Sequence, residues 1–315
     1  MLFRKTLCSI LIMFSAFTFG QNKMNEIGLI TDNDLYTSSK NDKYYTNGLE
    51  FFYRFLVKND QEAINKNILE FRIGQYIYNP RTIKANDARL NDRPFAGYLF
   101  AEAGRTSFYQ NESVFKVAVQ LGFIGVNSFA EEMQKEFHAI FNYKSVQGWQ
   151  YQIKNAVALQ TNFLFSKKLF VKQNKQNVDF HFQSKADLGT IFTGVSAGFL
   201  TRISIKKVLP VYDSNLYGGS VLANSQQNDS ELYFYIVPGI NYQLYDATIQ
   251  GSLFNDSSPI TYDLIPFRFN AESGIKYRKN NLNLSYAFIY RGKELKNDLV
   301  TGYFYGSIAI AYLFK

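Results

Sequence analysis

Oxygen-bearing side chains are crowded into residues 31–51, TDNDLYTSSKNDKYYTNGLEF, between two strand-like segments. The Asp and Asn side chains of this stretch are Asp32, Asn33, Asp34, Asn41, Asp42 and Asn47. Carboxylate and amide oxygens are the ligands that hard cations such as Ca²⁺ prefer, although the glycine and the distal glutamate of an EF-hand are missing. Asn and Asp are also ordinary loop residues because they tolerate turn conformations. The stretch alone therefore leaves a cation site and a plain loop both open.

The chain has only two histidines, and histidine is the side chain best suited to acid–base catalysis near neutral pH. His138 belongs to SFAEEMQKEFHAIFNY, residues 128–143, where apolar residues recur at helical spacing and Ser128 and Glu131 are spaced as a capping box. Gln134 precedes His138 by four residues, so both should share one face of an amphipathic helix of about three turns. A lone helical histidine is more often a spectator. We interpret His181, near a strand end with no polar constellation around it, as one.

The N-terminus has the pattern of a secretory signal peptide. Arg4 and Lys5 precede the apolar residues 7–19, and small residues follow. We expect residues 1–20 to be this peptide and residues 21–315 to form one domain. Cleavage after Gly20 would remove Cys8, the only cysteine, which excludes disulfides and cysteine chemistry in the mature chain. It would also lower the formal net charge from +8 to about +6, a basic excess that fits an anionic surface or ordinary solvated lysines.

Apolar and polar residues alternate with period two along much of the chain. In residues 115–123, FKVAVQLGF, every odd position is apolar and every even one is polar or small. Residues 267–272 and 282–288 repeat the alternation, the former with charged residues on the other face. A soluble sandwich turns its apolar face inward, whereas an outer-membrane barrel turns it to lipid. The signal peptide, the 23 Tyr and 30 Phe, and the repeated charges on the opposite face favour an all-β transmembrane antiparallel barrel.

The pattern predicts about twelve strands, an even number as closed bacterial barrels require. They are expected near residues 25–33, 46–57, 67–78, 95–108, 113–124, 148–165, 180–203, 231–243, 245–255, 262–279, 281–292 and 301–314. The segment 180–203 is long enough to hide a hairpin at Gly189. With both termini in the periplasm, short connections at 58–66, 109–112, 243–245 and 279–281 lie there, and long ones at 34–45, 79–94, 125–147 and 204–230 lie outside. The helix around His138 then lies in the third extracellular loop, with its apolar stripe against the barrel wall.

Five short blocks, in this order, carry a family resemblance. They are Asn33-Asp34, Tyr45-Thr46-Asn47-Gly48, Asn91-Asp92-Arg93-Pro94-Phe95-Ala96-Gly97, Gln134-x-x-x-His138 and Gly148-Trp149-x-x-Gln152. The chain resembles the lipid A 3′-O-deacylase family, outer-membrane barrels of Gram-negative bacteria. The blocks cover about the first half of the mature chain and all fall at the extracellular end of the expected topology.

The resemblance implies a calcium-dependent ester hydrolase that removes the acyloxyacyl group from the 3′ position of lipid A, in the cell outer membrane with its active site at the extracellular side. It implies His138 as general base, Asn33 and Asp34 as calcium ligands, and Thr46 and Gln134 as residues that complete the metal's shell or orient the water. The family's oxyanion-donating lysine corresponds most closely to Lys84. An acidic residue that some members carry shortly after the histidine is absent here.

Other classes of protein are less well supported by the sequence. A passive porin or binding barrel needs none of Asp34, Thr46 and His138, and an outer-membrane phospholipase needs a Ser–His pair that has no counterpart at a matching strand position. No nucleic-acid signature, P-loop, zinc motif or nucleophile elbow is found in the sequence. The family resemblance implies lipid A as the partner, and no nucleic acid and no protein partner are predicted.

Overall fold

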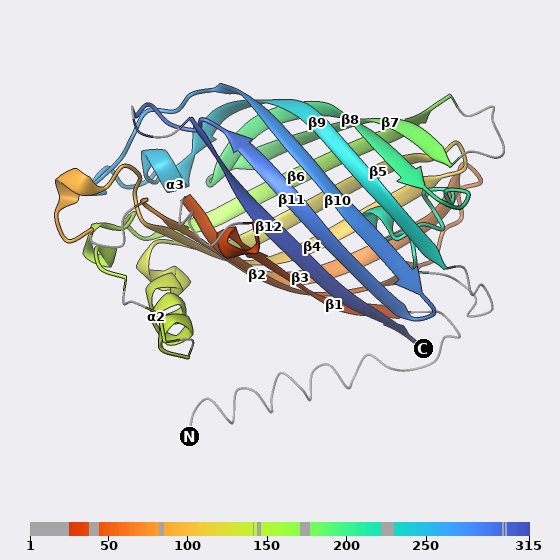
Figure 1. Cartoon of the computed structure of the whole chain (residues 1–315), viewed down its shortest axis with the longest axis horizontal. Helices are drawn as coiled ribbons and strands as arrows, with labels where there is room; N and C mark the ends of the chain where they lie inside the picture. Colours follow the sequence, from red (N-terminus) through yellow and green to blue (C-terminus); the bar gives the residue numbers. More distant parts are fainter. Residues whose placement is uncertain are drawn as a thin grey trace.

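The computed structural model describes residues 25–37, 44–81, 85–140, 142–143, 146–170, 177–221, 230–297, 299 and 301–315. Twelve antiparallel strands close into one barrel, each paired with its sequence neighbours and β1 with β12, which confirms the predicted fold class (Figure 1). The strands are β1 Asn25–Asn33, β2 Tyr44–Val57, β3 Ile64–Asn79, β4 Ala96–Tyr109, β5 Ser113–Ile124, β6 Ala156–Leu169, β7 Val178–Gly189, β8 Phe192–Ser204, β9 Glu231–Asp246, β10 Phe267–Lys279, β11 Leu282–Gly292 and β12 Gly302–Phe314.

The barrel has two distinct ends. Asn25 pairs with Phe314, so both ends of the described chain lie together at what we call the terminal end. The opposite end, which we call the loop end, carries the long connections after β1, β3 and β5. Within the described residues, no helix is long and apolar enough to cross a membrane. The expected signal peptide lies outside the described residues.

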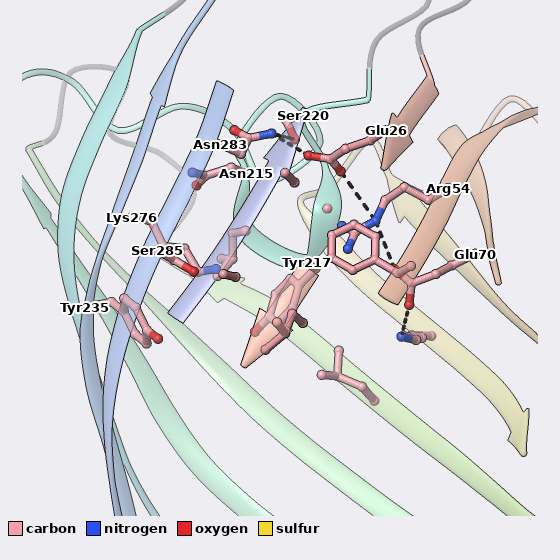
Figure 2. Close-up of a pocket in the computed structure, with 18 of the residues that line it drawn as sticks. Glu26, Arg54, Glu70, Asn215, Tyr217, Ser220, Tyr235, Lys276, Asn283 and Ser285 are labelled. Carbon is pink, nitrogen blue, oxygen red and sulfur yellow. Dashed lines mark hydrogen bonds and ion pairs between the residues drawn. The ribbon is translucent and has the colours of Figure 1, made fainter. Parts of the chain in front are cut away.

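The period-two alternation separates the outer wall from the lumen as predicted. On β5, Val119 is 43% exposed on the outside, whereas the neighbouring Gln120 is 7% exposed and donates to Glu102 in the lumen at 2.7 Å. Charged side chains in the lumen pair with one another. Glu70 contacts Arg54, at 2.9 Å from Nε (Figure 2), and Lys116, at 2.9 Å from Nζ. Such pairing offsets the cost of holding charges away from bulk water.

The connection between β8 and β9 lies at the terminal end, which corrects the prediction that 204–230 is an outer loop. Its described part, residues 205–221, folds into the lumen. Lys66 Nζ donates to the carbonyls of Gly219 and Val221 at 2.5 and 2.9 Å, and Asn283 Nδ2 donates to the Ser220 hydroxyl at 3.0 Å. A cavity of about 300 Å³ remains beside this segment, and Tyr217 lines it (Figure 2).

Two errors in the strand prediction cancel in the count of twelve. The segment 180–203 is two strands, β7 and β8, joined at Thr190 and Ile191, so the hairpin at Gly189 is confirmed. The segment 245–255 is not a strand: β9 continues to Asp246, whose carboxylate accepts from Thr248 N at 2.9 Å and caps the short helix α3, Ala247–Gln250. The connection expected at 243–245 is therefore wrong. The extra reversal at Gly189 is what moves 204–230 to the terminal end.

Candidate functional site

Four outward-facing residues form a row across the outer wall near the loop end. The strand register pairs Asn33 with Asn47, Asn47 with Ile77 and Ile77 with Gly97. Asn33 is an even number of residues from Ile27, which is 47% exposed on the outside, and side chains two apart share one face of a strand. Residues of the first, second and third blocks therefore meet on the outside of the barrel, and not in its lumen.

Asn33 and Asp34 lie where β1 ends. The Asn33 amide donates to Asn47 Oδ1 at 2.6 Å and accepts from Leu35 N at 2.7 Å, which caps a 3₁₀ turn, Asp34–Tyr36. Asp34 is only 3% exposed. Its backbone carbonyl accepts from Thr37 N at 3.1 Å, which closes the turn. The cap thus fixes a buried carboxylate at the rim of the wall.

A β-bulge places Thr46 beside this turn. The pairing of β2 with β3 shifts between Tyr45 and Asn47, so Thr46 is the extra residue. Thr46 is 2% exposed, and its hydroxyl donates to the Ile77 carbonyl at 3.4 Å. Bulges re-aim side chains next to active sites, and this one brings a hydroxyl to the row that contains Asn33.

The oxygen donors of Asn33, Asp34 and Thr46, which we call the site corner, suit a hard cation. The Asp34 carboxylate, the Asn33 amide oxygen, which keeps a second lone pair, and the Thr46 hydroxyl are the donor types that Ca²⁺ takes. Among the described residues, no group of three His, Cys, Asp or Glu side chains could hold a metal ion. A calcium ion here would therefore take most of its six to eight ligands from carbonyl, amide, hydroxyl and water oxygens.

The predicted helix, α2 (Ala130–Ile140), stands against the outer wall at the loop end, outside the ring of strands (Figure 1). Gln75, on the outer face of β3, donates from Nε2 to the Ser128 carbonyl at 2.6 Å. A Cβ atom on Gly97 would lie 2.0 Å from Ser128 Oγ and 2.2 Å from Ala130 Cβ, so only glycine permits this close approach. A small apolar cluster outside the wall supports it: Ile77, Ala85, Phe95, Ala130, Val146 and Trp149.

Gln134 and His138 lie on one face of α2, as predicted. Ala130 and Gln134 are the buried positions of the helix, and His138 follows one turn later with a half-buried ring. Gln134 Oε1 accepts from Trp149 Nε1 at 2.8 Å, which joins the fourth block to the fifth. The Tyr143 ring meets the His138 ring edge-on, with centroids 5.7 Å apart. The face with Ala130 and Gln134 is turned to the wall, and His138 follows on that face one turn later.

The apolar stripe of α2 does not lie against the wall, which corrects the sequence-based expectation. Phe129, Met133 and Ile140 are 60%, 46% and 74% exposed. The physical reason is the close approach at Gly97, which leaves room for alanine but not for phenylalanine. The capping box is also absent, because Ser128 ends a 3₁₀ turn, Val126–Ser128, and donates to the Gly125 carbonyl.

Lys84 lies outside the described residues, so its contribution stays a prediction.

The block around Asp92 and Arg93 carried the resemblance without an assigned role. In the structure it binds the loops together at the loop end. Asp92 accepts from Arg81 N at 2.8 Å and from the Tyr44 hydroxyl at 3.1 Å. Arg93 is fully buried, donates to Thr248 Oγ1 at 2.9 Å, and lies 4.4 Å from the centre of the Tyr78 ring.

A tyrosine of the segment after α3 also supports this block. The Tyr262 hydroxyl donates to the Asn91 carbonyl at 2.5 Å, and burial raises the pKa of Tyr262. The hydroxyl therefore stays protonated as a donor at physiological pH. The polar and aromatic residues of the block were visible in the sequence, but their partners, up to 171 residues away, were not.

His181 has polar neighbours, which corrects the interpretation from the sequence. It is fully buried near the terminal end, with Nε2 3.1 Å from Asp179 Oδ2. Arg202 donates from Nε to the other oxygen of Asp179 at 2.9 Å. This network holds β7 to β8 at the opposite end of the barrel from α2, so His181 does not belong to the candidate site.

Docking of α2 can be followed through Trp149, the only tryptophan of the chain. Gly97→Leu should displace α2 from the wall and expose Trp149, now 1% exposed, so its fluorescence emission should shift to longer wavelength. Ala101→Leu places the same leucine side chain at an exposed outward position of β4 and should leave the emission unchanged. Unshifted emission in folded Gly97→Leu would contradict the described packing.

A closed antiparallel barrel with an apolar outer face and a charged lumen is the architecture of outer-membrane β-barrel proteins. The family model described as outer membrane protein LpxR matches residues 6–314, and the chain belongs to this family. This confirms the resemblance carried by the five blocks and makes the chain an outer-membrane barrel of the lipid A deacylase family.

A solved structure supports the fold. LpxR from Salmonella typhimurium matches with a TM-score of 0.74 at 19% identity, covering 92% of this chain and 100% of that chain. The β domain of the Bordetella autotransporter BrkA matches with a TM-score of 0.47 at 8% identity, covering 92% of this chain and 97% of that chain. The search of curated proteins gives no match.

Proposed function

We propose that this protein is a calcium-dependent hydrolase that removes the 3′-linked acyloxyacyl group of lipid A, with its active site at the extracellular side of the outer membrane. The observation that carries the proposal is the position of the site corner. Asn33, Thr46 and α2 all lie on the outside of the barrel wall near the loop end, where a membrane lipid can reach them without entering the lumen. A channel would have placed its selective residues inside.

The residues support ester hydrolysis in a specific way. His138 takes a proton from the attacking water, whose oxygen bonds to the ester carbonyl carbon. When the intermediate collapses, the bond to the sugar oxygen breaks, and the proton passes from His138 to that oxygen. The products are the free acyloxyacyl acid and a sugar hydroxyl. Gln134 holds α2 to Trp149 and so positions His138, while Lys84 is proposed as an oxyanion donor.

Asp34, with Asn33 and Thr46, is proposed to bind the calcium ion. When bound there, the ion would polarise the ester carbonyl and stabilise developing negative charge. The capped turn and the bulge have the physical role of keeping these donors in place, because a cation site must be organised before substrate arrives.

The alternative is a catalytically inactive or passive barrel of the porin or binding type. The described residues count against an open channel, since Arg93 and its partners bind the loops together at the loop end and residues 205–221 enter the lumen at the terminal end. They do not count against an inactive enzyme, which only an activity measurement tests.

Mass spectrometry of lipid A decides between these functions. Lipid A from Gram-negative cells that express the protein should lack the 3′ acyloxyacyl group, and lipid A from cells without it should retain the group. The barrel should be shown folded in both membrane preparations by heat-modifiable migration. Identical lipid A in both, with folded protein and calcium present, would reject the deacylase proposal and leave the passive barrel.

A further inference from the structure

A trough lies in the outer wall, on strands away from the candidate site. The register joins five outward positions into one row: Phe163, Ala186, Val195, Tyr242 and Phe267. Phe267 is 62% exposed, Val195 54% and Tyr242 46%, as expected for the membrane-facing side. Large side chains from β6, β9 and β10 thus flank smaller ones on β7 and β8.

The next row toward the terminal end repeats this order of sizes. Phe165 pairs with Ser184, Ser184 with Ala197, and Ala197 with Ile240. The two rows together enclose a groove of about 390 Å³. Because Ser184, Ala186 and Ala197 are short, the groove floor is set back from the surrounding rings and remains largely apolar.

Two aromatic side chains lie beside the groove toward the terminal end. Phe182 and Phe199 pair in the following row, and their ring centroids lie 5.9 Å apart in an edge-on arrangement. A groove bounded on two sides fits a single flexible chain better than a flat surface does. The apolar wall continues on every side of it, so lipid is the medium that meets this face.

A cation stands beside the groove on the same outer face. Lys167 is two residues beyond Phe165 on β6, pairs with Phe182, and is exposed. Within the described residues it forms no ion pair, unlike the lumenal Lys168, whose Nζ lies 2.7 Å from Glu112. Lys167 is near the terminal end of β6, where phospholipid headgroups of that leaflet would lie, and an ammonium group there complements a phosphate.

We propose that this groove, lined by Phe163, Phe165, Ala186, Val195, Ala197 and Tyr242, binds one acyl chain of an anionic phospholipid from the leaflet at the terminal end, with Lys167 at the phosphate. This lipid site is independent of the deacylation site, which lies on β1–β4 and α2. The ligand is a resident lipid and not a substrate.

Native mass spectrometry of the delipidated, folded full chain with added phosphatidylglycerol tests the proposal. The wild type should retain one lipid per barrel under activation that removes all others. Ala197→Phe fills the groove and should lower the retained single-lipid fraction by about tenfold, the factor expected from losing contact with one or two methylene groups. Ala103→Phe, the same change at an exposed outward position of β4, should not lower it.

The headgroup contact has its own variant. Lys167→Gln should remove the preference for phosphatidylglycerol over phosphatidylcholine, while Lys58→Gln, at an exposed lysine in the β2–β3 turn, should keep it. Four results would each overturn the proposal. They are a statistical distribution of bound lipids without a preferred single adduct, equal retention in wild type and Ala197→Phe, a dimer mass in place of a lipid adduct, and preferential retention of lipid A. None of these readouts depends on deacylation, so a failure here leaves the proposed function standing.

Discussion

Replacing His138 by asparagine should lower the rate of 3′ deacylation by about 10²- to 10⁴-fold, the usual contribution of a general base. Asparagine keeps a polar side chain of similar reach but cannot accept and return the proton of the attacking water. Because the buried positions of α2 are Ala130 and Gln134, the helix should remain docked. Release of the acyloxyacyl acid from purified lipid A, measured by mass spectrometry over time, checks the rate.

Two controls separate catalysis from structure in that experiment. Emission of Trp149 should be the same in wild type and His138→Asn, since the Gln134–Trp149 hydrogen bond is untouched. Glu136→Gln changes an exposed side chain on the same helix and should leave the rate unchanged. Near-wild-type release by His138→Asn would show that the water is activated without this histidine.

Replacing Asp34 by asparagine should abolish turnover or raise the calcium concentration needed for it by orders of magnitude. The change removes the formal charge from a hard-cation site while nearly preserving side-chain shape. The barrel should stay folded, because the turn is capped by Asn33 and closed by backbone hydrogen bonds of residue 34. Calcium binding by calorimetry and deacylation over a calcium series give two separate readouts.

The matched control for this carboxylate is Asp60→Asn, at an exposed turn of the terminal end. It should leave both calcium binding and activity unchanged. Full deacylation by the wild type in excess chelator would exclude the metal, and calcium binding by Asp34→Asn with wild-type affinity would move the ion to other ligands.

The alternation of side chains determined the barrel without help from tertiary structure. Period two fixes which residues share a face. The signal-peptide pattern, the aromatic content and the repeated charges opposite the apolar face favoured lipid over a second sheet as the cover of that face. The bounds of β1 and β5 were predicted to the residue for this reason. Alternation alone does not place a very short turn, as at Thr190 and Ile191, and it fails where an alternating stretch follows a cap, as after Asp246.

The order of the five blocks determined the family and most of the candidate residues, because each block is short and its residue types are chemically demanding. It did not determine which side of the wall they occupy. One extra residue at Thr46 reverses the faces of β2, so only the paired register of Asn33, Asn47, Ile77 and Gly97 shows that the site lies outside.

Tertiary structure alone decided how α2 meets the barrel. Helical spacing showed one apolar stripe and one face with Gln134 and His138, and burial in water would favour turning the stripe inward. At a membrane rim that preference is weakened, because lipid is as apolar as a protein core. The close contact of Gly97 with Ala130 then selects the face with small and polar residues, and His138 lies on that face one turn after Gln134.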